Sequence, residues 1–204
     1  MKLYKQSEIE LIANILKDDG VISVPTDTVY GICARINSSK AYNKLVNVKK
    51  RPSYKSFPVL CKDLEQIKSI AIVDERIEKL IKTFMPGPIT LVLNKRPEVL
   101  SYINNAGGRE TNELAVRMAP FEFLSELIEQ VGSPLFLSSA NKSGKDVCKS
   151  LEEIEKECPT LDGMVEGNIS FGKASTILDC TSSDIKIQRE GPILEEQIRE
   201  AITK

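Results

Sequence analysis

The sequence contains no histidine, and its 204 residues carry a formal net charge of only -1. The absence of histidine excludes a Ser-His-Asp triad, a Cys-His nucleophile pair and any His-ligated metal site. The near-neutral charge gives no global positive field that would attract nucleic acid, although a local basic patch is compatible with it. Any chemistry must therefore use lysine, arginine, hydroxyl, carboxylate and backbone groups.

Cysteine pairs and long apolar runs are absent as well. The five cysteines are scattered and form no C-x-x-C, so we expect buried free thiols rather than disulfides or a zinc site. No apolar run approaches the length of a membrane span, and residues 1–20 lack the apolar core of a signal peptide. We therefore expect a soluble, cytoplasmic protein that does not associate with membranes.

Helical and strand patterns alternate along the chain, which is 41% hydrophobic. This composition supports one globular domain over residues 1–204. The apolar patterns predict strands at 21–24, 57–61, 89–93, 114–118, 135–137, 175–178 and 185–188. They predict helices at 39–48, 63–70, 74–84, 121–131, 150–157 and 195–202. Because the alternation is irregular, we expect an α/β fold with a mixed sheet.

A further helix is predicted before the first strand. Ser7-Glu8-Ile9-Glu10 has the pattern of a capping box, and Gly20 suits the C-terminal end of this helix. Its predicted apolar face consists of Leu11, Ile12, Ile15 and Leu16. Residues 107–112, with the sequence GGRETN, are typical of a mobile loop.

A turn rich in functional groups follows the strand predicted at 21–24. Residues 25–31 read P-T-D-T-V-Y-G, which brings two hydroxyls, a carboxylate and a phenol together. In α/β proteins, ligands bind in such turns at the carboxyl ends of strands. The alternative is an ordinary strand exit in which Thr28 and Tyr30 pack against the sheet.

A basic run, Lys49-Lys50-Arg51-Pro52, lies at the end of the helix predicted at 39–48, and Lys55 follows shortly after. Cations favour this end of a helix because of the helix dipole, which is one explanation. The other explanation is a phosphate-binding site, because arginine donates two parallel hydrogen bonds to phosphate oxygens and lysine acts as a point charge.

Arg117 lies within the otherwise apolar strand predicted at 114–118. Unpaired charges are rarely buried, so this side chain either pairs with a carboxylate or reaches a binding site. In a binding site, its natural partner would be an anion such as the carboxylate of an amino acid.

Two more polar clusters border predicted strands. Residues 138–144 read S-S-A-N-K-S-G, and Ser175-Thr176 and Arg189-Glu190-Gly191 flank the last two strands. Each cluster alone is also compatible with an ordinary polar turn. The sequence has no Walker A motif and no G-x-G-x-x-G, so a bound nucleotide would depend on the basic residues for its phosphate contacts.

Together, these motifs resemble the YrdC-like or Sua5-like family in their order along the chain, from Gly20 to Gly191. The resemblance rests on P-T-D-T-V-Y-G, K-x-R-P, M-P-G-P-I-T-L-V-L, V-R-M, S-S-A-N-K-S-G, S-T-I-L-D and R-E-G. It departs from the family at Lys50, where K-G-R is usual, and it corresponds to the short, single-domain type. The resemblance implies a twisted, largely open α/β sheet with a concave, positively charged cavity.

The resemblance also implies an enzyme of the L-threonylcarbamoyladenylate synthase type, a nucleotidyltransferase. Such an enzyme converts L-threonine, bicarbonate or CO2, and ATP into threonylcarbamoyl-adenylate and pyrophosphate, with Mg2+ accompanying the nucleotide. The product serves the synthesis of N6-threonylcarbamoyladenosine (t6A) in tRNA, which a separate transferase complex completes in bacteria. tRNA itself is a candidate partner.

Matched motif by motif, the resemblance assigns two groups of site residues and no metal ligand. The expected ATP-binding residues are Lys49, Arg51, Lys55, Asn141 and Arg189, of which Lys49 and Arg51 are the expected catalytic residues. The expected threonine-binding residues are Thr28, Arg117, Ser139 and Ser175, with Arg117 on the carboxylate. Tyr30 and Ser143 are expected to contact these site residues rather than the substrates.

Two alternatives stay open at this point. One is a carbamoyltransferase-like module that handles carbamoyl-adenylate, although such modules usually belong to much larger chains with zinc-finger-like parts. The other is a module that binds double-stranded RNA or tRNA through Lys49, Lys50, Arg51 and Lys55. The net charge and the lack of aromatic platforms near these residues weaken the RNA-binding hypothesis.

Overall fold

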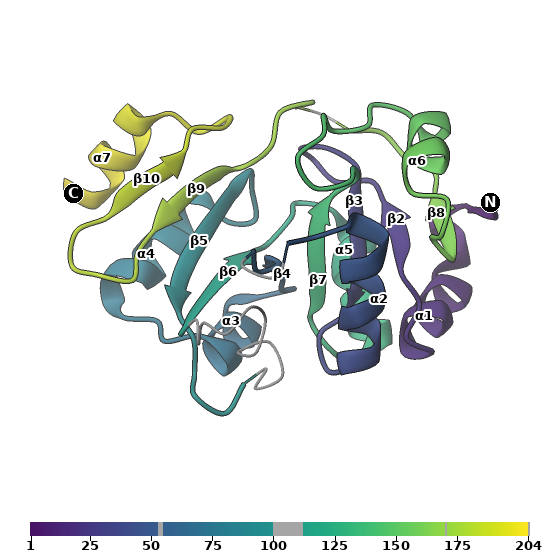
Figure 1. Cartoon of the computed structure of the whole chain (residues 1–204). Coiled ribbons are helices and arrows are strands. Elements are labelled where there is room, and N and C mark those ends of the chain that lie inside the picture. Colours follow the sequence, from purple (N-terminus) through teal and green to yellow (C-terminus); the bar gives the residue numbers. More distant parts are fainter. Residues whose placement is uncertain (53–54, 100–111, 170, 204) are drawn as a thin grey trace.

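The computed structural model describes residues 1–52, 55–99, 112–169 and 171–203. Across these residues, ten strands form one mixed sheet in the order β1-β8-β2-β3-β7-β4-β6-β5-β9-β10 (Figure 1). The strands are β1 (Leu3–Tyr4), β2 (Ile22–Val24), β3 (Gly31–Arg35), β4 (Val59–Leu60), β5 (Ile89–Asn94), β6 (Glu113–Arg117), β7 (Leu135–Ser139), β8 (Gly163–Val165), β9 (Thr176–Asp179) and β10 (Lys186–Arg189). This arrangement confirms the predicted α/β fold with a twisted, mixed, open sheet.

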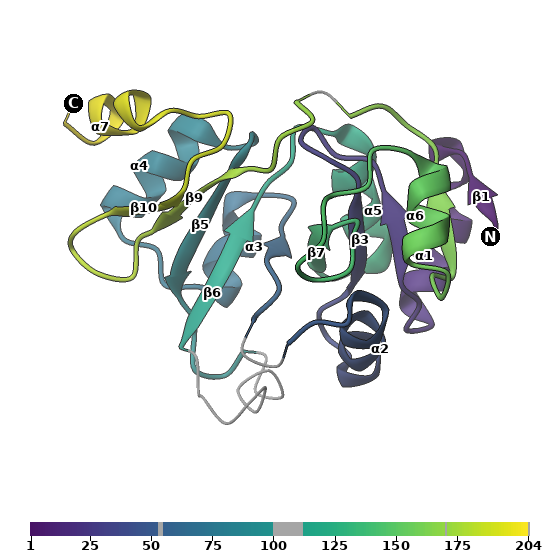
Figure 2. The same ribbon diagram turned by 45° about the horizontal axis from the view of Figure 1, so that its top comes forward.

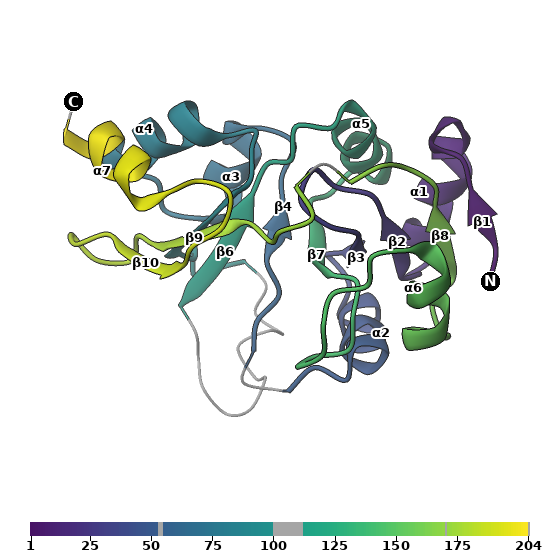
Figure 3. The ribbon, with the colours of Figure 1, turned by 90° about the horizontal axis from the view of Figure 1, so that it is seen from above.

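The helices alternate with these strands along the chain. They are α1 (Ile9–Lys17), α2 (Ser39–Lys49), α3 (Leu64–Ile70), α4 (Glu75–Phe84), α5 (Glu122–Val131), α6 (Leu151–Glu157) and α7 (Glu195–Thr203), with a 3-10 turn η1 at Gln6–Glu8. Seen from above, α1, α3, α4 and α5 line one face of the sheet, and on the other face α2 lies near β3 and β7 and α6 lies near β8 (Figure 3). The part of the sheet that contains β6 and β9 is not covered by α2 and α6 on this second face.

The predicted strands agree with the observed strands in place, and three observed strands were not predicted. β4 is shorter than the prediction of 57–61, because only Val59 and Leu60 pair with neighbouring strands. β1 and β8 are too short to give a periodic pattern. β3 follows directly on the polar turn 25–31, and its first four residues are all buried, so it shows no alternation of polar and apolar residues.

The beginning of the first helix differs from the prediction. The N-cap lies two residues earlier, where the Lys5 backbone N–H donates to the Glu8 carboxylate at 2.8 Å, so Ser7 is not the cap. Leu11 is half exposed, and Ala13 takes its place on the buried face. At the other end, Asp19 has φ 63°, and the Gly20 N–H donates to the Ile15 carbonyl at 2.8 Å. The left-handed residue of this helix end is therefore Asp19 rather than Gly20.

Two apolar clusters hold the sheet between its helices. One cluster packs α1 and α5 against the sheet and includes Ile12, Leu16, Leu127 and Leu135. The other includes a group of aromatic rings, Tyr42, Phe57 and Phe136, whose centroids lie 5.5–6.0 Å apart. Such edge-on and tilted ring contacts fix the segment before β4 against α2 and β7.

The two halves of the sheet meet at β4, which lies at the middle of the molecule (Figures 1 and 2). β4 is parallel to β6 through two register pairs and antiparallel to β7 through two more. The neighbouring pairs are longer, with five register pairs between β3 and β7 and four between β5 and β6. We call this short pairing the β4 junction, and it lies beside the site described next.

Candidate functional site

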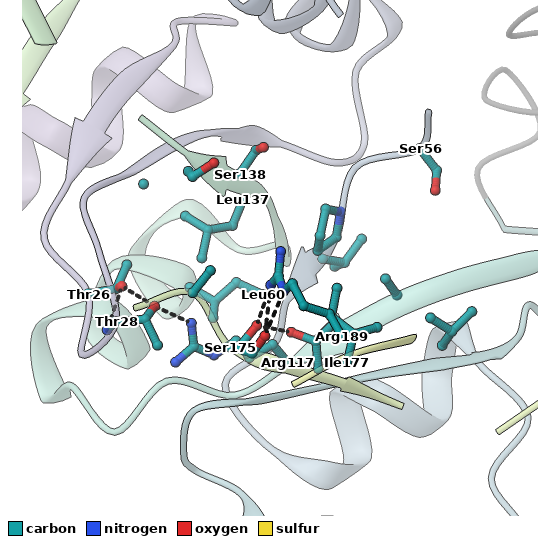
Figure 4. Close-up of a pocket in the computed structure, with 18 of the residues that line it drawn as sticks. Thr26, Thr28, Ser56, Leu60, Arg117, Leu137, Ser138, Ser175, Ile177 and Arg189 are labelled. Carbon is teal, nitrogen blue, oxygen red and sulfur yellow. Dashed lines mark hydrogen bonds between the residues drawn. The ribbon is translucent and has the colours of Figure 1, made fainter. Parts of the chain in front are cut away.

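A cavity of about 420 Å³ lies on the sheet across the β4 junction. Strands from both halves line it. Residues before β3 and residues between α2 and β4 also contribute to its lining. Its polar lining comes from three arginines, seven hydroxyl side chains, one carboxylate and one amide, namely Arg51, Arg117, Arg189, Thr26, Thr28, Thr90, Ser56, Ser138, Ser139, Ser175, Glu113 and Gln188. Figure 4 shows Thr28, Arg117 and Ser175 on one wall, with Ser138 and Ser56 across from them.

The turn 25–31 is held in shape by the hydroxyl of Thr26. Thr26 Oγ1 accepts the backbone N–H groups of Thr28 and Val29 at 3.2 Å each and donates to the Val29 carbonyl at 2.6 Å. It also lies 3.0 Å from Thr28 Oγ1. Because short polar side chains stabilise turns in this way, the two threonines form a rigid part of the cavity wall.

Arg117 reaches the cavity and also pairs with a carboxylate, so both alternatives predicted for it hold at once. Its Nη2 donates to Asp27 Oδ1, its Nη1 to Thr28 Oγ1 at 2.9 Å, and its Nε to the Gly87 carbonyl at 3.2 Å. Burial lowers the pKa of Arg117, and the paired Asp27 acts in the opposite direction. The positive charge of Arg189 also lowers the pKa of Arg117, which indicates that the two guanidinium groups share one region of the cavity.

Arg189 and Ser175 form the adjoining wall. Arg189 donates to the Ser175 carbonyl from Nε at 3.0 Å and from Nη2 at 2.8 Å. Ser175 Oγ lies 2.8 Å from Thr90 Oγ1, and both side chains are buried. Burial lowers the pKa of Arg189, yet its partners at Ser175 carry no formal charge. Arg189 therefore brings a positive charge that these partners do not neutralise.

Arg51 lies on the opposite side of the β4 junction, and the end of α2 directs it there. Lys50 is left-handed with φ 47°, and the Arg51 N–H donates to the Val46 carbonyl at 3.1 Å, so the chain reverses at this point. The Arg51 guanidinium donates to the carbonyls of Lys55 and Ser56 and lies 4.3 Å from the centroid of the Phe57 ring. Burial lowers the pKa of Arg51 to about 10, so it remains a cation at neutral pH.

Lys49 lies outside the cavity lining and is only 1% exposed. Its Nζ donates to the Ser139 carbonyl and, at 3.3 Å, to Asn141 Oδ1, which also accepts Ser139 Oγ at 2.6 Å. Burial, reinforced by the charge of Arg51, lowers the pKa of Lys49 to about 7. The amide of Asn141 donates to the carbonyls of Lys142 and Lys145, so Lys49 and Asn141 together fix the loop after β7.

Six of the residues predicted for the site are brought together in the cavity lining. They are Thr28, Arg51, Arg117, Ser139, Ser175 and Arg189. Lys49 and Asn141 lie behind this lining, and Lys55 is exposed, with its carbonyl bonded to Arg51.

The two predicted supporting residues also have defined contacts. The hydroxyl of Tyr30 donates to the Gly167 carbonyl, and the Ser143 N–H donates to the Lys49 carbonyl at 2.8 Å. The loop predicted at 107–112 lies outside the described residues except for Asn112.

The structure adds Asp27 and Thr90 to the residues singled out from the sequence. Asp27 stands inside the motif P-T-D-T-V-Y-G, but nothing in the sequence indicates that it pairs with Arg117, 90 positions away. Thr90 is the second residue of the apolar strand β5, and a hydroxyl at such a position was an available signal. Buried hydroxyls usually have a specific partner, and here the partner is Ser175.

The described part of the chain contains neither a cluster of metal-binding side chains nor a helix suited to cross a membrane. No group of three or more His, Cys, Asp or Glu side chains in this part of the chain is arranged to hold a metal ion. No helix among the described residues combines the length and apolar character that a membrane crossing requires.

Comparison with known proteins gives the family. The sequence model Sua5_yciO_yrdC, described as "Telomere recombination", matches residues 14–191. The chain is 32% identical to the threonylcarbamoyl-AMP synthase of Bacillus subtilis over 96% of its own length, and 30% identical to that of Yersinia enterocolitica over 78%. The protein is therefore an α/β protein that belongs to the Sua5/YciO/YrdC family.

Solved structures agree with this assignment. Sua5 of P. abyssi in complex with L-threonine superposes with a TM-score of 0.90 and 28% identity over 98% of this chain. The chain spans 60% of that Sua5 chain, 56% of the B. subtilis protein and 85% of the Y. enterocolitica protein. It thus corresponds to a little over half of the longer relatives and to most of the shorter one.

Proposed function

We propose that the protein is an L-threonylcarbamoyladenylate synthase. The observation that carries this proposal is one cavity with a cation and hydroxyl groups on each side of the β4 junction, Arg51 with Ser138 on one side and Arg117 and Arg189 with Ser175 on the other. Two anionic groups, such as a nucleotide phosphate and an amino-acid carboxylate, can be held there side by side. The membership of the Sua5/YciO/YrdC family supports the same activity.

The chemistry suits a site without histidine. The amine of threonine forms a C–N bond with CO2 and loses a proton, which gives a carbamate anion. A carbamate oxygen then attacks the α-phosphorus of ATP, the bond between the α-phosphorus and its bridging oxygen breaks, and pyrophosphate leaves. Because the nucleophile is already an anion, catalysis consists mainly of positioning and of stabilising the charge on the phosphates.

Arg51 and Arg189 are the residues proposed to meet the ATP phosphates directly, because both are cavity-lining cations. Lys49 and Asn141 contribute by fixing the loop after β7, because the Lys49 ammonium group donates to the carbonyl of the cavity-lining Ser139 and to the side chain of Asn141. Lys55 holds Arg51 through its carbonyl and is itself an exposed residue. Lys49 and Arg51 remain the proposed catalytic residues.

Thr28, Arg117, Ser139 and Ser175 are proposed to bind threonine. Arg117 donates to the threonine carboxylate with the N–H groups that its protein partners leave available, and the three hydroxyl side chains complement the polar groups of the substrate. The apolar side chains of Leu60 and Leu137 line the same cavity and are suited to contact the methyl group of threonine.

Mg2+ is proposed to arrive with ATP as part of the substrate, held by phosphate oxygens and water. The described residues offer no cluster of acidic ligands for a separate metal cage. The product is proposed to serve t6A formation in tRNA through a downstream transferase complex. The alternative of an RNA-binding patch loses one of its four cations, because Lys49 is buried.

The test is ATP-to-pyrophosphate turnover measured with and without L-threonine and bicarbonate. Turnover that requires both substrates, with threonylcarbamoyl-AMP identified by mass spectrometry, supports the proposal. Arg51→Ala should abolish this turnover and leave the circular dichroism spectrum unchanged, whereas Arg199→Ala, at an exposed arginine of α7, should keep full activity. Threonine-independent turnover, or full activity of Arg51→Ala, would refute these assignments.

A further inference from the structure

Asp27 is buried directly behind Arg117. Its side chain is 2% exposed and that of Arg117 is 7% exposed. Of the described residues, Thr26 and Thr28 line the cavity, and Asp27 between them does not. Asp27 therefore contacts the guanidinium group from the side away from the cavity.

The guanidinium of Arg117 is fixed at all three of its nitrogens. Nε donates to Gly87, Nη1 to Thr28 and Nη2 to Asp27, and these three bonds use three of the five N–H donors of arginine. Asp27 is the charged partner among the three. A planar group held at three points has one orientation, so the two remaining N–H groups are presented in a fixed direction.

Stability alone is a poor explanation for this ion pair. The second carboxylate oxygen, Asp27 Oδ2, is buried and has no hydrogen-bond partner among the described residues. A buried carboxylate with one oxygen unsatisfied is costly, and buried ion pairs are often no more stabilising than apolar replacements. A costly arrangement that is built into a binding cavity points to a functional reason.

The backbone around Asp27 is held as firmly as its side chain. The Asp27 carbonyl accepts the N–H of Phe171 at 2.8 Å, and the Thr26 hydroxyl ties the two residues that follow Asp27. The carboxylate is therefore anchored before any ligand arrives. Pre-organised groups of this kind do not pay the cost of ordering when the ligand binds.

We propose that Asp27 is the positioning residue that orients Arg117 for the carboxylate of the amino-acid substrate. Asp27 also offsets the charge of Arg117, so this arginine acts mainly as a directional hydrogen-bond donor, and Arg189 supplies the net positive charge of this wall. The inference rests on the proposed function, because it takes the amino acid to be L-threonine. Its consequence is that the loss of Asp27 weakens threonine binding and leaves ATP binding intact.

The test compares wild-type protein with Asp27→Asn and Asp27→Glu by calorimetric titration with L-threonine and, separately, with ATP. Both variants should bind threonine about 10- to 100-fold more weakly, the usual effect of losing a charged hydrogen bond, and ATP within about twofold of wild type. Asn keeps the shape and removes the charge, whereas Glu keeps the charge and moves it. Thermal denaturation identifies which variants are folded.

A double variant separates positioning from an independent effect. If Asp27 acts through Arg117, Asp27→Asn should not weaken threonine binding further in an Arg117→Lys background. Additive losses would overturn the inference, as would a folded single variant with unchanged threonine affinity. Failure of both Asp27 variants to fold would also overturn it, because the residue would then be structural. If the wild-type protein itself did not bind threonine, the proposed function would fail and the inference with it.

Discussion

Replacement of Lys49 by methionine should change how the stability of the protein depends on pH. The structure buries this lysine almost completely and lowers its pKa from 10.5 to about 7. Between these two values the unfolded chain binds a proton at Lys49 that the folded chain does not bind. The contribution of Lys49 to stability therefore rises with pH across this window, because folding must remove the proton from this lysine and the free energy of that removal falls as the pH rises.

The size of the effect follows from the two pKa values. Below a pH of about 7, burial of the charged form imposes its full cost, and above this value each pH unit returns at most about 1.4 kcal/mol. From a pH of about 7 to about 8.5, Lys49 should therefore raise the free energy of unfolding of the wild-type protein by about 1.5 kcal/mol. The window stops there because the thiols of the unfolded chain are about half ionised at a pH of about 8.5, which acts in the opposite direction in wild type and variant alike and cancels in their difference.

The assay is urea unfolding at several pH values within this window. The difference in unfolding free energy between wild type and Lys49→Met should grow with pH in favour of wild type. The control is Lys17→Met, at an exposed lysine of α1, whose stability should run parallel to that of wild type. If Lys49→Met also ran parallel to wild type, the folded and unfolded states would bind the same number of protons at this residue, and the argument from burial would be refuted.

Further substitutions and reagents test other parts of the fold. Because Lys50 is left-handed at φ 47°, Lys50→Gly should raise the unfolding free energy in urea by about 0.5–1 kcal/mol, and a loss of stability would contradict the strain assigned to it. Leu127→Ala, in the fully buried α1–α5 cluster, should cost about 2–5 kcal/mol, against less than about 0.5 kcal/mol for the half-exposed Leu11→Ala. All five cysteines are buried, so a thiol reagent should label the native protein only as fast as it unfolds. Rapid labelling would reveal an accessible thiol.

The elements predicted most accurately from the sequence are those with strong apolar periodicity or a clear N-cap residue. Ser38, Asp63, Asp74 and Ser150 all cap their helices through the side chain, and the boundaries of these helices agree with the predictions within one residue. The first helix was the exception, because the chain already turns at Gln6–Glu8 and Lys5, whose side chain makes no cap hydrogen bond, takes the N-cap position. The bond from the Lys5 backbone N–H to Glu8 leaves no capping signal in the sequence.

The site was predictable to the extent that its residues lie in recognisable motifs. Those motifs gave six residues that share one cavity, but the sequence could not show which motif residues line the cavity and which lie behind its wall. Lys49 and Arg51 are two positions apart, yet the left-handed Lys50 between them sends one behind the wall and the other into it. Asp27 was missed as a functional residue because its partner, Arg117, is close only after the sheet has formed.

The β4 junction has a mechanical consequence for any molecule that binds beside it. Only two register pairs on each side connect the halves of the sheet at this point, against five between β3 and β7 and four between β5 and β6, so few backbone hydrogen bonds join the two halves there. A ligand held by Arg51 on one half and by Arg117 and Arg189 on the other would act as a cross-link between them. Its binding would then stabilise the folded protein by an amount that grows with the logarithm of the ligand concentration above Kd, so the substrates themselves would strengthen the connection between the two halves.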